Sequence, residues 1–180
     1  RVSGMQVALP LPVVPEDTVK LADAPAWERM AADYAVLGMS PRHHPIDLLR
    51  SRLPDDLVTT RGLQSLRNGM PVRIGGLVVC RQRPGTAKGV TFLLIEDELG
   101  VANVVVYSKL YEDQRTLVRA EPFILVEGHV QWEDRNLNII ADRFRPLRSV
   151  LADEKAGDAD ESASVVKLIT DLSPSSHNYR

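Results

Sequence analysis

The sequence of 180 residues lacks several features that define whole classes of proteins. Its single cysteine, Cys80, excludes a disulfide within the chain and any metal site built from clustered cysteines. Its apolar runs are far shorter than the roughly 20 residues that a helix needs to cross a bilayer. No basic segment followed by an apolar one marks a secretory signal. We therefore expect a cytoplasmic protein without membrane contact.

Net charge and aromatic side chains are also limited. The net charge is -2, and aromatic residues make up 5% of the chain. The chain as a whole is therefore not expected to attract nucleic acid, and such binding would need a local basic patch. The hydrophobic fraction of 44% is close to that of ordinary globular domains, so a core can form. Each exposed aromatic side chain would be a candidate for a specific contact.

The N-terminal third of the chain divides into two parts. Residues 1–22 contain three prolines, which disfavour helix and predict an extended lead-in. Residues 23–69 predict a helical connector that begins with a helix over 23–38, capped by Asp23 and ended at Gly38. A stripe at helical spacing predicts packing of this helix against the core: Trp27, Met30, Tyr34 and Leu37.

A second short helix is predicted to start at Pro45, since proline suits the first helical position. Neighbouring His43 and His44 could ligate zinc, but a zinc site needs three or four ligands and none stands nearby at a suitable spacing. We therefore expect a histidine to cap this helix or to pack at its start. The residues expected to face inward are Ile46, Leu49 and Leu53. One further helical turn is predicted over residues 62–68.

Residues 70–147 change to β-branched residues with an apolar period near two, which predicts strands. Five such runs follow one another: VRIGGLVVCR, GVTFLLIED, VANVVVYS, PFILVEGHVQW and LNIIADRF. A bend is expected at Gly75-Gly76. A helix is predicted between the third and fourth strands, over KLYEDQRTLVRA. This order is that of an OB-fold, so we predict a mainly β protein whose five-stranded barrel follows a small helical segment.

Residues 148–180 are expected to form an acidic linker and a C-terminal tail. The tail VVKLITDLSPSSHNYR has an apolar start and a polar end. It could dock as a short strand or helix, or order only on a partner.

The cleft of an OB-fold is lined by strands two and three and by the loops that join strands 1–2 and 4–5. Here those loops, RQRPGTAKG and WEDRN, carry cations that could neutralise phosphates and a tryptophan that could stack on a base. With both loops expected on one rim, the pattern favours single-stranded nucleic acid over two merely solvated loops. The predicted contacts are Arg81, Arg83, Lys88, Trp132, Arg135 and Asn136, with Phe92, Tyr107 and Lys109 as weaker candidates. Two of these have an alternative in the core: Trp132 shares the parity of Val130, and a phenylalanine in a strand, such as Phe92, is more often a core residue.

Other polar clusters give no sign of a catalytic centre. The acids Glu96-Asp97-Glu98 could bind Mg²⁺, but neighbouring side chains on a strand alternate in direction, so a polar hairpin turn is the better explanation. Cys80 is expected to be a buried, inert thiol. His129 has no nucleophile in view, and no phosphate-binding glycine motif is present. We expect no catalytic residue, metal or cofactor in this chain.

Two stretches resemble a known family. Residues 30–53 share a pattern with the error-prone branch of bacterial C-family DNA polymerases, carried by Asp33-Tyr34, Gly38, Ser40, His44-Pro45 and Leu49-Arg50. The run from Val72 to Glu112 resembles the C-terminal OB region of the same polymerases. The resemblance covers residues from about 5 to about 147.

The resemblance implies a fragment of a DNA-directed DNA polymerase that acts in damage-induced, translesion synthesis. In that family the OB module meets single-stranded template DNA, and paired aspartates of a separate palm domain hold Mg²⁺. The fragment should therefore bind template without polymerising. The implied partners are the rest of the polymerase chain, an inactive Y-family-like protein, a RecA-like accessory protein and the sliding clamp. Two alternatives stay open: a protein-interaction module for polymerase accessory partners, or the OB domain of another enzyme such as a tRNA synthetase.

Overall fold

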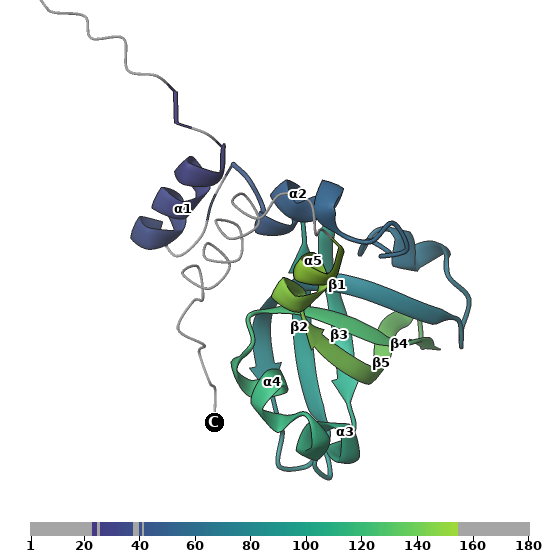
Figure 1. Ribbon diagram of the computed structural model, residues 1–180. Helices are drawn as coiled ribbons and strands as arrows, with labels where there is room; N and C mark the ends of the chain where they lie inside the picture. The colour runs from purple at the N-terminus through teal and green to yellow at the C-terminus, as the bar shows by residue number, and fades with distance from the viewer. Residues whose placement is uncertain (1–22, 25, 38–39, 41, 155–180) are drawn as a thin grey trace, which may run out of the picture.

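The computed structural model, in which residues 23, 24, 26–37, 40 and 42–154 are described, is built on a closed five-stranded barrel (Figure 1). Its strands are β1 (Pro71–Gln82), β2 (Thr91–Asp97), β3 (Gly100–Val106), β4 (Phe123–Glu133) and β5 (Asn136–Pro146). Around the barrel they follow the order β1-β2-β3-β5-β4, and β3 runs parallel to β5. The OB-fold barrel predicted from the sequence is confirmed.

The interior of the barrel follows from the alternation of side chains along each strand. Ile95, Val104 and Ile139 come from three adjacent strands, and none has exposed surface. Burying one such side chain contributes about 1.5–3 kcal/mol relative to leaving it in water. The apolar period of two that marks these strands in the sequence thus supplies the core that closes the barrel.

Strand β1 bends so that it can pair with two partners. Its first half, up to Leu77, pairs with β4, and its second half, from Leu77 on, pairs with β2. The predicted glycine pair lies at this change of partner. A Cβ on Gly76 would stand 2.9 Å from the backbone oxygen of Glu96, closer than real Cβ atoms come, so glycine allows the close approach of β2.

Short helices precede, interrupt and follow the barrel. They are α1 (Ala26–Leu37), α2 (Pro45–Leu49), the 3₁₀ turns η1 (Arg50–Arg52) and η2 (Gly62–Ser65), α3 (Ser108–Asp113), α4 (Arg115–Ala120) and α5 (Leu147–Glu154). Figure 1 shows α3 and α4 at one end of the barrel and α2 and α5 at the other. None of the described helices combines the length and the apolar character that crossing a membrane requires.

The single helix predicted after the third strand is two helices that meet at Gln114. The Gln114 side chain explains the position of this break. Its Nε2 donates to the Phe144 carbonyl at 3.0 Å, and its Oε1 accepts from the Phe144 backbone N–H at 2.8 Å. The amide therefore continues the backbone pairing of β5 and fixes both helices against that strand.

A second apolar cluster joins α2 and α5 to the outside of the barrel. Ile46, Leu49 and Leu53 are all buried, as predicted. Residues 148–154 were expected to begin a linker, but they belong to α5, because Val150 and Leu151 pack with Leu147 into this cluster. The rest of the predicted linker and tail, residues 155–180, lies outside the described residues.

The apolar stripe of α1 is only partly covered. Met30 is 1% exposed and belongs to the second cluster, whereas Trp27 and Leu37 are 45% and 61% exposed. The expectation that the stripe is core is therefore wrong at these two positions, because the helix touches the rest of the protein through Met30. The side chain of Tyr34, the predicted helix end at Gly38 and the predicted lead-in over residues 1–22 lie outside the described residues.

Candidate nucleic-acid interface

Strands β2 and β3 present one face to the outside of the barrel, here called the outward face. On it Phe92 lies opposite Val105, and Leu94 lies opposite Asn103. Phe92 is 39% exposed, whereas its neighbour Leu93 is 1% exposed. Of the two positions considered for Phe92, the core position favoured from the sequence is therefore wrong. Successive strand residues face opposite sides, and the inner side at this point is filled by Leu93.

Tyr107 places a second aromatic ring on the outward face. Its backbone is extended, with φ -70° and ψ 154°, and it follows Val106, which has no exposed surface. Because side chains alternate along a strand, Tyr107 faces the same way as Val105, two residues earlier. Phe92 lies opposite Val105, so Tyr107 and Phe92 are diagonal neighbours across the two strands. Such neighbours lie about 7–8 Å apart, and Tyr107 is 51% exposed. We call Phe92 and Tyr107 the aromatic pair.

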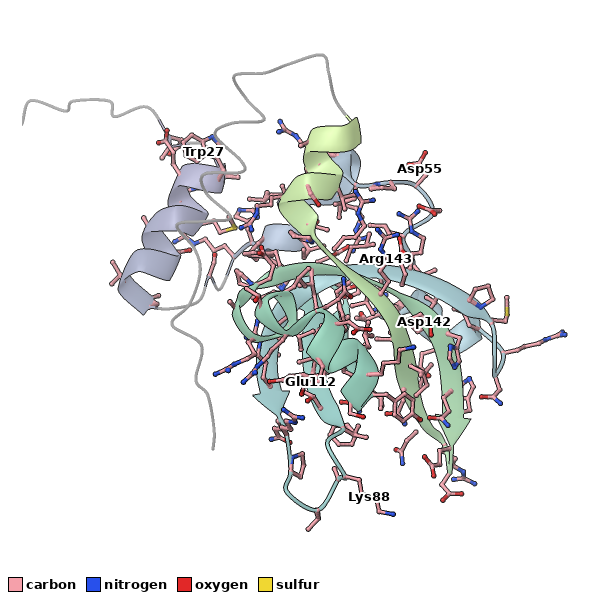
Figure 2. The ribbon with its side chains drawn as sticks, turned by 60° about the horizontal axis from the view of Figure 1, so that its bottom comes forward. Trp27, Asp55, Lys88, Glu112, Asp142 and Arg143 are labelled. Carbon is pink, nitrogen blue, oxygen red and sulfur yellow. The ribbon has the colours of Figure 1, made fainter. Side chains whose placement is uncertain are left out.

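Two lysines lie at the same end of the outward face. Lys88 is at the tip of the β1–β2 loop (Figure 2), and the next residue, Gly89, lies against Ser108 at the start of α3. Lys109 follows directly on Ser108, so the backbones of both lysines lie near Tyr107, the residue that precedes Ser108. Both side chains are exposed, and within the described part of the chain neither forms an ion pair. They remain available for an external anion.

The two arginines of the same loop are engaged within the protein. Arg81 donates from Nε to the Val118 carbonyl at 2.9 Å and from Nη2 to the Glu121 carbonyl at 2.5 Å. Burial lowers the pKa of Arg81. The guanidinium therefore satisfies carbonyls at the end of α4, which otherwise lack partners.

Arg83 stacks over the Tyr111 ring, 4.1 Å from its centroid, and forms an ion pair with Glu112 at 3.4 Å. This contact holds the base of the β1–β2 loop against α3. Of the three cations predicted in the loop, Lys88 is the one that extends into solvent without an internal partner in the described structure.

The β4–β5 turn lies at the other end of the outward face. Asp134 and Arg135 have φ angles of 45° and 71°, as a two-residue hairpin turn requires. Because β5 runs parallel to β3 and Asn138 pairs with Asn103, the start of β5 lies beside the start of β3. The expectation that both basic loops share one rim is therefore wrong. Arg135 and Asn136 are exposed, about 20 Å along the strands from the lysines.

Trp132 holds the connector rather than an open surface. Its Nε1 donates to the Leu66 carbonyl at 3.0 Å, and its backbone N–H donates to Asn68 Oδ1 at 2.9 Å. The half-buried indole packs on the barrel core together with Leu137. It shares the inward parity of Val130, which explains why the ring is not presented to solvent.

The acidic turn between β2 and β3 attaches the barrel to the connector. Asp97 is 3% exposed, and its carboxylate accepts hydrogen bonds from Thr60 N at 2.7 Å and Thr60 Oγ1 at 2.5 Å. It also accepts from the backbone N–H groups of Leu99 and Gly100, which shape the turn. The predicted hairpin is confirmed. Its link to Thr60 was missed because that partner lies 37 residues away.

His44 caps α2, one of the two roles predicted for it, since its Nδ1 accepts from the Ile46 backbone N–H at 3.1 Å. Burial lowers the pKa of His44, an effect that nearby carboxylates oppose. Cys80 is half-buried on β1. The residues that the structure describes include no group of three or more His, Cys, Asp or Glu side chains placed to hold a metal ion.

Comparison with known proteins relates this chain to two groups. Residues 72–147 match the family of OB-fold nucleic acid binding domains. The chain is 42% identical over 134 residues to an error-prone DNA polymerase from Anaeromyxobacter sp. (strain K), which covers 74% of the chain and 12% of that protein. It is 39% identical over 155 residues to an error-prone DNA polymerase from Pseudomonas paraeruginosa, covering 83% of the chain and 15% of that protein.

Solved structures match about half of the chain at lower similarity. Asparaginyl-tRNA synthetase from Pyrococcus horikoshii, complexed with asparaginyl-adenylate, is 20% identical with a TM-score of 0.46, over 52% of this chain and 23% of that one. The OBody AM1L10, bound to hen egg-white lysozyme, is 17% identical with a TM-score of 0.43, over 53% of this chain and 94% of that one.

Proposed function

Because the chain belongs to the bacterial error-prone DNA polymerases, of whose length it spans 12–15%, we propose that it is a non-catalytic region that binds single-stranded template DNA. The strand lies on the outward face of β2 and β3. The parent protein would then be a DNA-directed DNA polymerase that acts on damaged template, with Mg²⁺ held elsewhere in it. A Y-family-like protein, a RecA-like protein and the sliding clamp are proposed as partners of the whole protein.

The observation that supports this proposal is the aromatic pair. Phe92 and Tyr107 are exposed on one face, although aromatic residues make up only 5% of the chain. Every base has a π-face, so an exposed ring can stack on an unpaired base whatever its sequence, worth about 1–3 kcal/mol per base. Bases within a duplex are already stacked on each other, so this surface favours single strands.

The charges near the aromatic pair suit a small number of phosphates. Lys88 and Lys109 are exposed at the end of the face where Tyr107 lies, and Arg135 is exposed at its far end. Each phosphate neutralised on a single strand contributes about -0.7 to the slope of log K against log salt. Three cations thus give a slope of about -2, which is shallow. We infer that base stacking carries more of the affinity than phosphate contacts do.

Fluorescence anisotropy with a labelled 12-nucleotide single strand, and with a duplex of the same length, tests the proposal. The single strand is expected to bind more tightly, and F92A/Y107A is expected to weaken it at least tenfold, since two stacking contacts are removed. Trp27→Ala is the matched control, because Trp27 is an exposed aromatic on α1 away from the face. Equal binding by F92A/Y107A and the wild type would show that the strand does not lie on this face.

A further inference from the structure

Three amide side chains form a row across the barrel, and we propose that this row reads the edges of bases in the bound strand. Asn138 on β5 lies opposite Asn103 on β3 and opposite Gln131 on β4. The three residues therefore stand at one level on three adjacent strands. The inference rests on the proposed single-strand binding and adds to it a preference for particular bases.

All three amides face outward. Their neighbours along the strands fill the barrel interior and have no exposed surface: Val104, Ile139 and Val130. Alternation therefore turns the amides of Asn103, Asn138 and Gln131 to the outside. Asn103 is exposed, and the other two are half-buried. The row is thus accessible, but it is partly shielded from water.

The hydrogen-bonding capacity of the row is unused within the described part of the chain. Each amide carries two donor hydrogens and a carbonyl acceptor. None of the three side chains forms a hydrogen bond with another described residue, whereas the amides of Gln114 and Asn68 are both engaged. Direct neighbours on a sheet are about 5 Å apart, so the row presents donors and acceptors over roughly 10 Å.

The chemistry of the row matches bases better than phosphates. It holds no charge, and the cations lie at the two ends of the outward face, at Lys88 and Arg135. A base edge presents neutral donors and acceptors side by side, and an amide can pair with two of them at once. A good bidentate pair of this kind discriminates against the wrong base by about 1–3 kcal/mol.

The row is also placed where a base would lie. Asn103 is two residues before Val105 on the same face, and Val105 lies opposite Phe92. A strand that stacks one base on the aromatic pair and continues toward Arg135 therefore crosses the amides. Leu94, half-buried opposite Asn103, supplies an apolar surface beside them.

The test compares labelled dA12, dC12 and dT12 at one salt concentration by fluorescence anisotropy. The wild type is expected to bind one of them at least tenfold more tightly than the weakest. In N103A/N138A/Q131A the three affinities are expected to fall within threefold of one another. Gln64→Ala is the matched control, because Gln64 is an exposed amide on η2, outside the face, and it should keep the wild-type preference.

Because alanine weakens a strand, a second variant with threonine at the three positions should also lose the preference. Circular dichroism checks that both variants fold. Base reading is overturned if the wild-type affinities for the three strands lie within twofold of one another. It is also overturned if both variants keep the wild-type preference. Either result leaves single-strand binding intact. Loss of affinity for all three strands alike assigns the row to general binding and also overturns it. A wild type that binds none of the strands overturns the proposed function itself.

Discussion

Arg50 donates two hydrogen bonds to the carboxylate of Glu98, from Nε and from Nη2, each 2.8 Å long. The pair joins η1 of the connector to the β2–β3 turn, 48 residues later in the chain. Its bidentate geometry is the strong form of an arginine–carboxylate contact. The same Nη2 lies 3.6 Å from the buried carboxylate of Asp97, so one guanidinium serves two of the three acids in the turn.

This pair is expected to contribute to stability beyond an ordinary surface ion pair. In a double-mutant cycle with R50A and E98A, measured by urea unfolding, we expect a coupling free energy of about 1–3 kcal/mol. Arg83 and Glu112 provide the matched control, as their contact is longer at 3.4 Å and more exposed. Their coupling should stay below about 1 kcal/mol. Equal coupling in the two cycles would contradict the prediction.

Gly128 is expected to tolerate no side chain. A Cβ there would stand 2.1 Å from the Ile140 backbone oxygen, at the point where the pairing of β4 and β5 shifts register. Since backbone must move, Gly128→Ala should lower the free energy of unfolding by more than about 2 kcal/mol. Gly85→Ala meets no atom within 4 Å and should change it by less than about 0.5 kcal/mol. Similar midpoints and slopes in urea for both variants would show that the bulge can open without cost.

Stability is expected to fall in mild acid in a way that depends on His44. Burial lowers the pKa of His44 in the fold, so near pH 6.5 and below the unfolded chain takes up more protons at this site than the native one. The free energy of unfolding therefore declines as the pH falls through about 6.5, by at most about 1.4 kcal/mol per pH unit from this group. The nearby carboxylates reduce the effect, the largest contribution coming from Glu96.

His44→Asn separates this effect from the titration of other groups. Asparagine keeps an acceptor at the start of α2 but does not titrate. Urea unfolding from pH 7.5 to pH 5.5 should show the wild type losing more stability than the variant. His43→Asn is the control and should follow the wild-type curve. If H44N declined as steeply as the wild type, the acid dependence would belong to other residues.

Lys88 and Lys109 are expected to contribute to DNA binding, whereas Arg81 is expected to contribute to stability. The slope of log K against log salt for single-strand binding is expected to be about -2 in the wild type. In K88Q/K109Q it should become less negative by about 1.4, because two phosphate contacts are lost. Arg81→Gln should leave the slope unchanged and instead lower the free energy of unfolding by about 1–3 kcal/mol, since the carbonyls of Val118 and Glu121 at the end of α4 lose their donor. A salt titration and a urea titration of both variants decide this. A change of slope in R81Q would show that its guanidinium reaches the DNA.

The barrel could be predicted from the sequence because its signals are local. The alternation of apolar residues, the glycine pair at 75 and 76, and Pro45 at a helix start each act within a few residues. The presence of α5 was missed because its apolar residues Val150 and Leu151 stand beside an acidic stretch that resembles a linker. Their burial depends on a cluster assembled from distant parts of the chain.

The candidate site was predicted less well. A residue can belong to it only if its side chain is exposed and is not already bonded within the protein, and the sequence does not show this. Arg81 and Lys88 look equivalent in the sequence, but the carbonyls that Arg81 binds lie in α4 and at its C-cap, 37 and 40 residues further on. Trp132 could have been a stacking residue or a core residue, and it packs on the core and hydrogen-bonds to the connector, whereas Phe92, for which a core position was favoured, is exposed.

The sequence by itself determined the five strands, their order and the positions of the turns, because strand period and turn chemistry are set by neighbouring residues. Only the tertiary structure decided which face of each strand meets solvent, which cations are free, and that the two basic loops lie at opposite ends of that face. The physical reason is that pairing and burial join residues far apart in the chain. The parallel register of β3 with β5 brings Asn103 beside Asn138, and no local pattern records that contact.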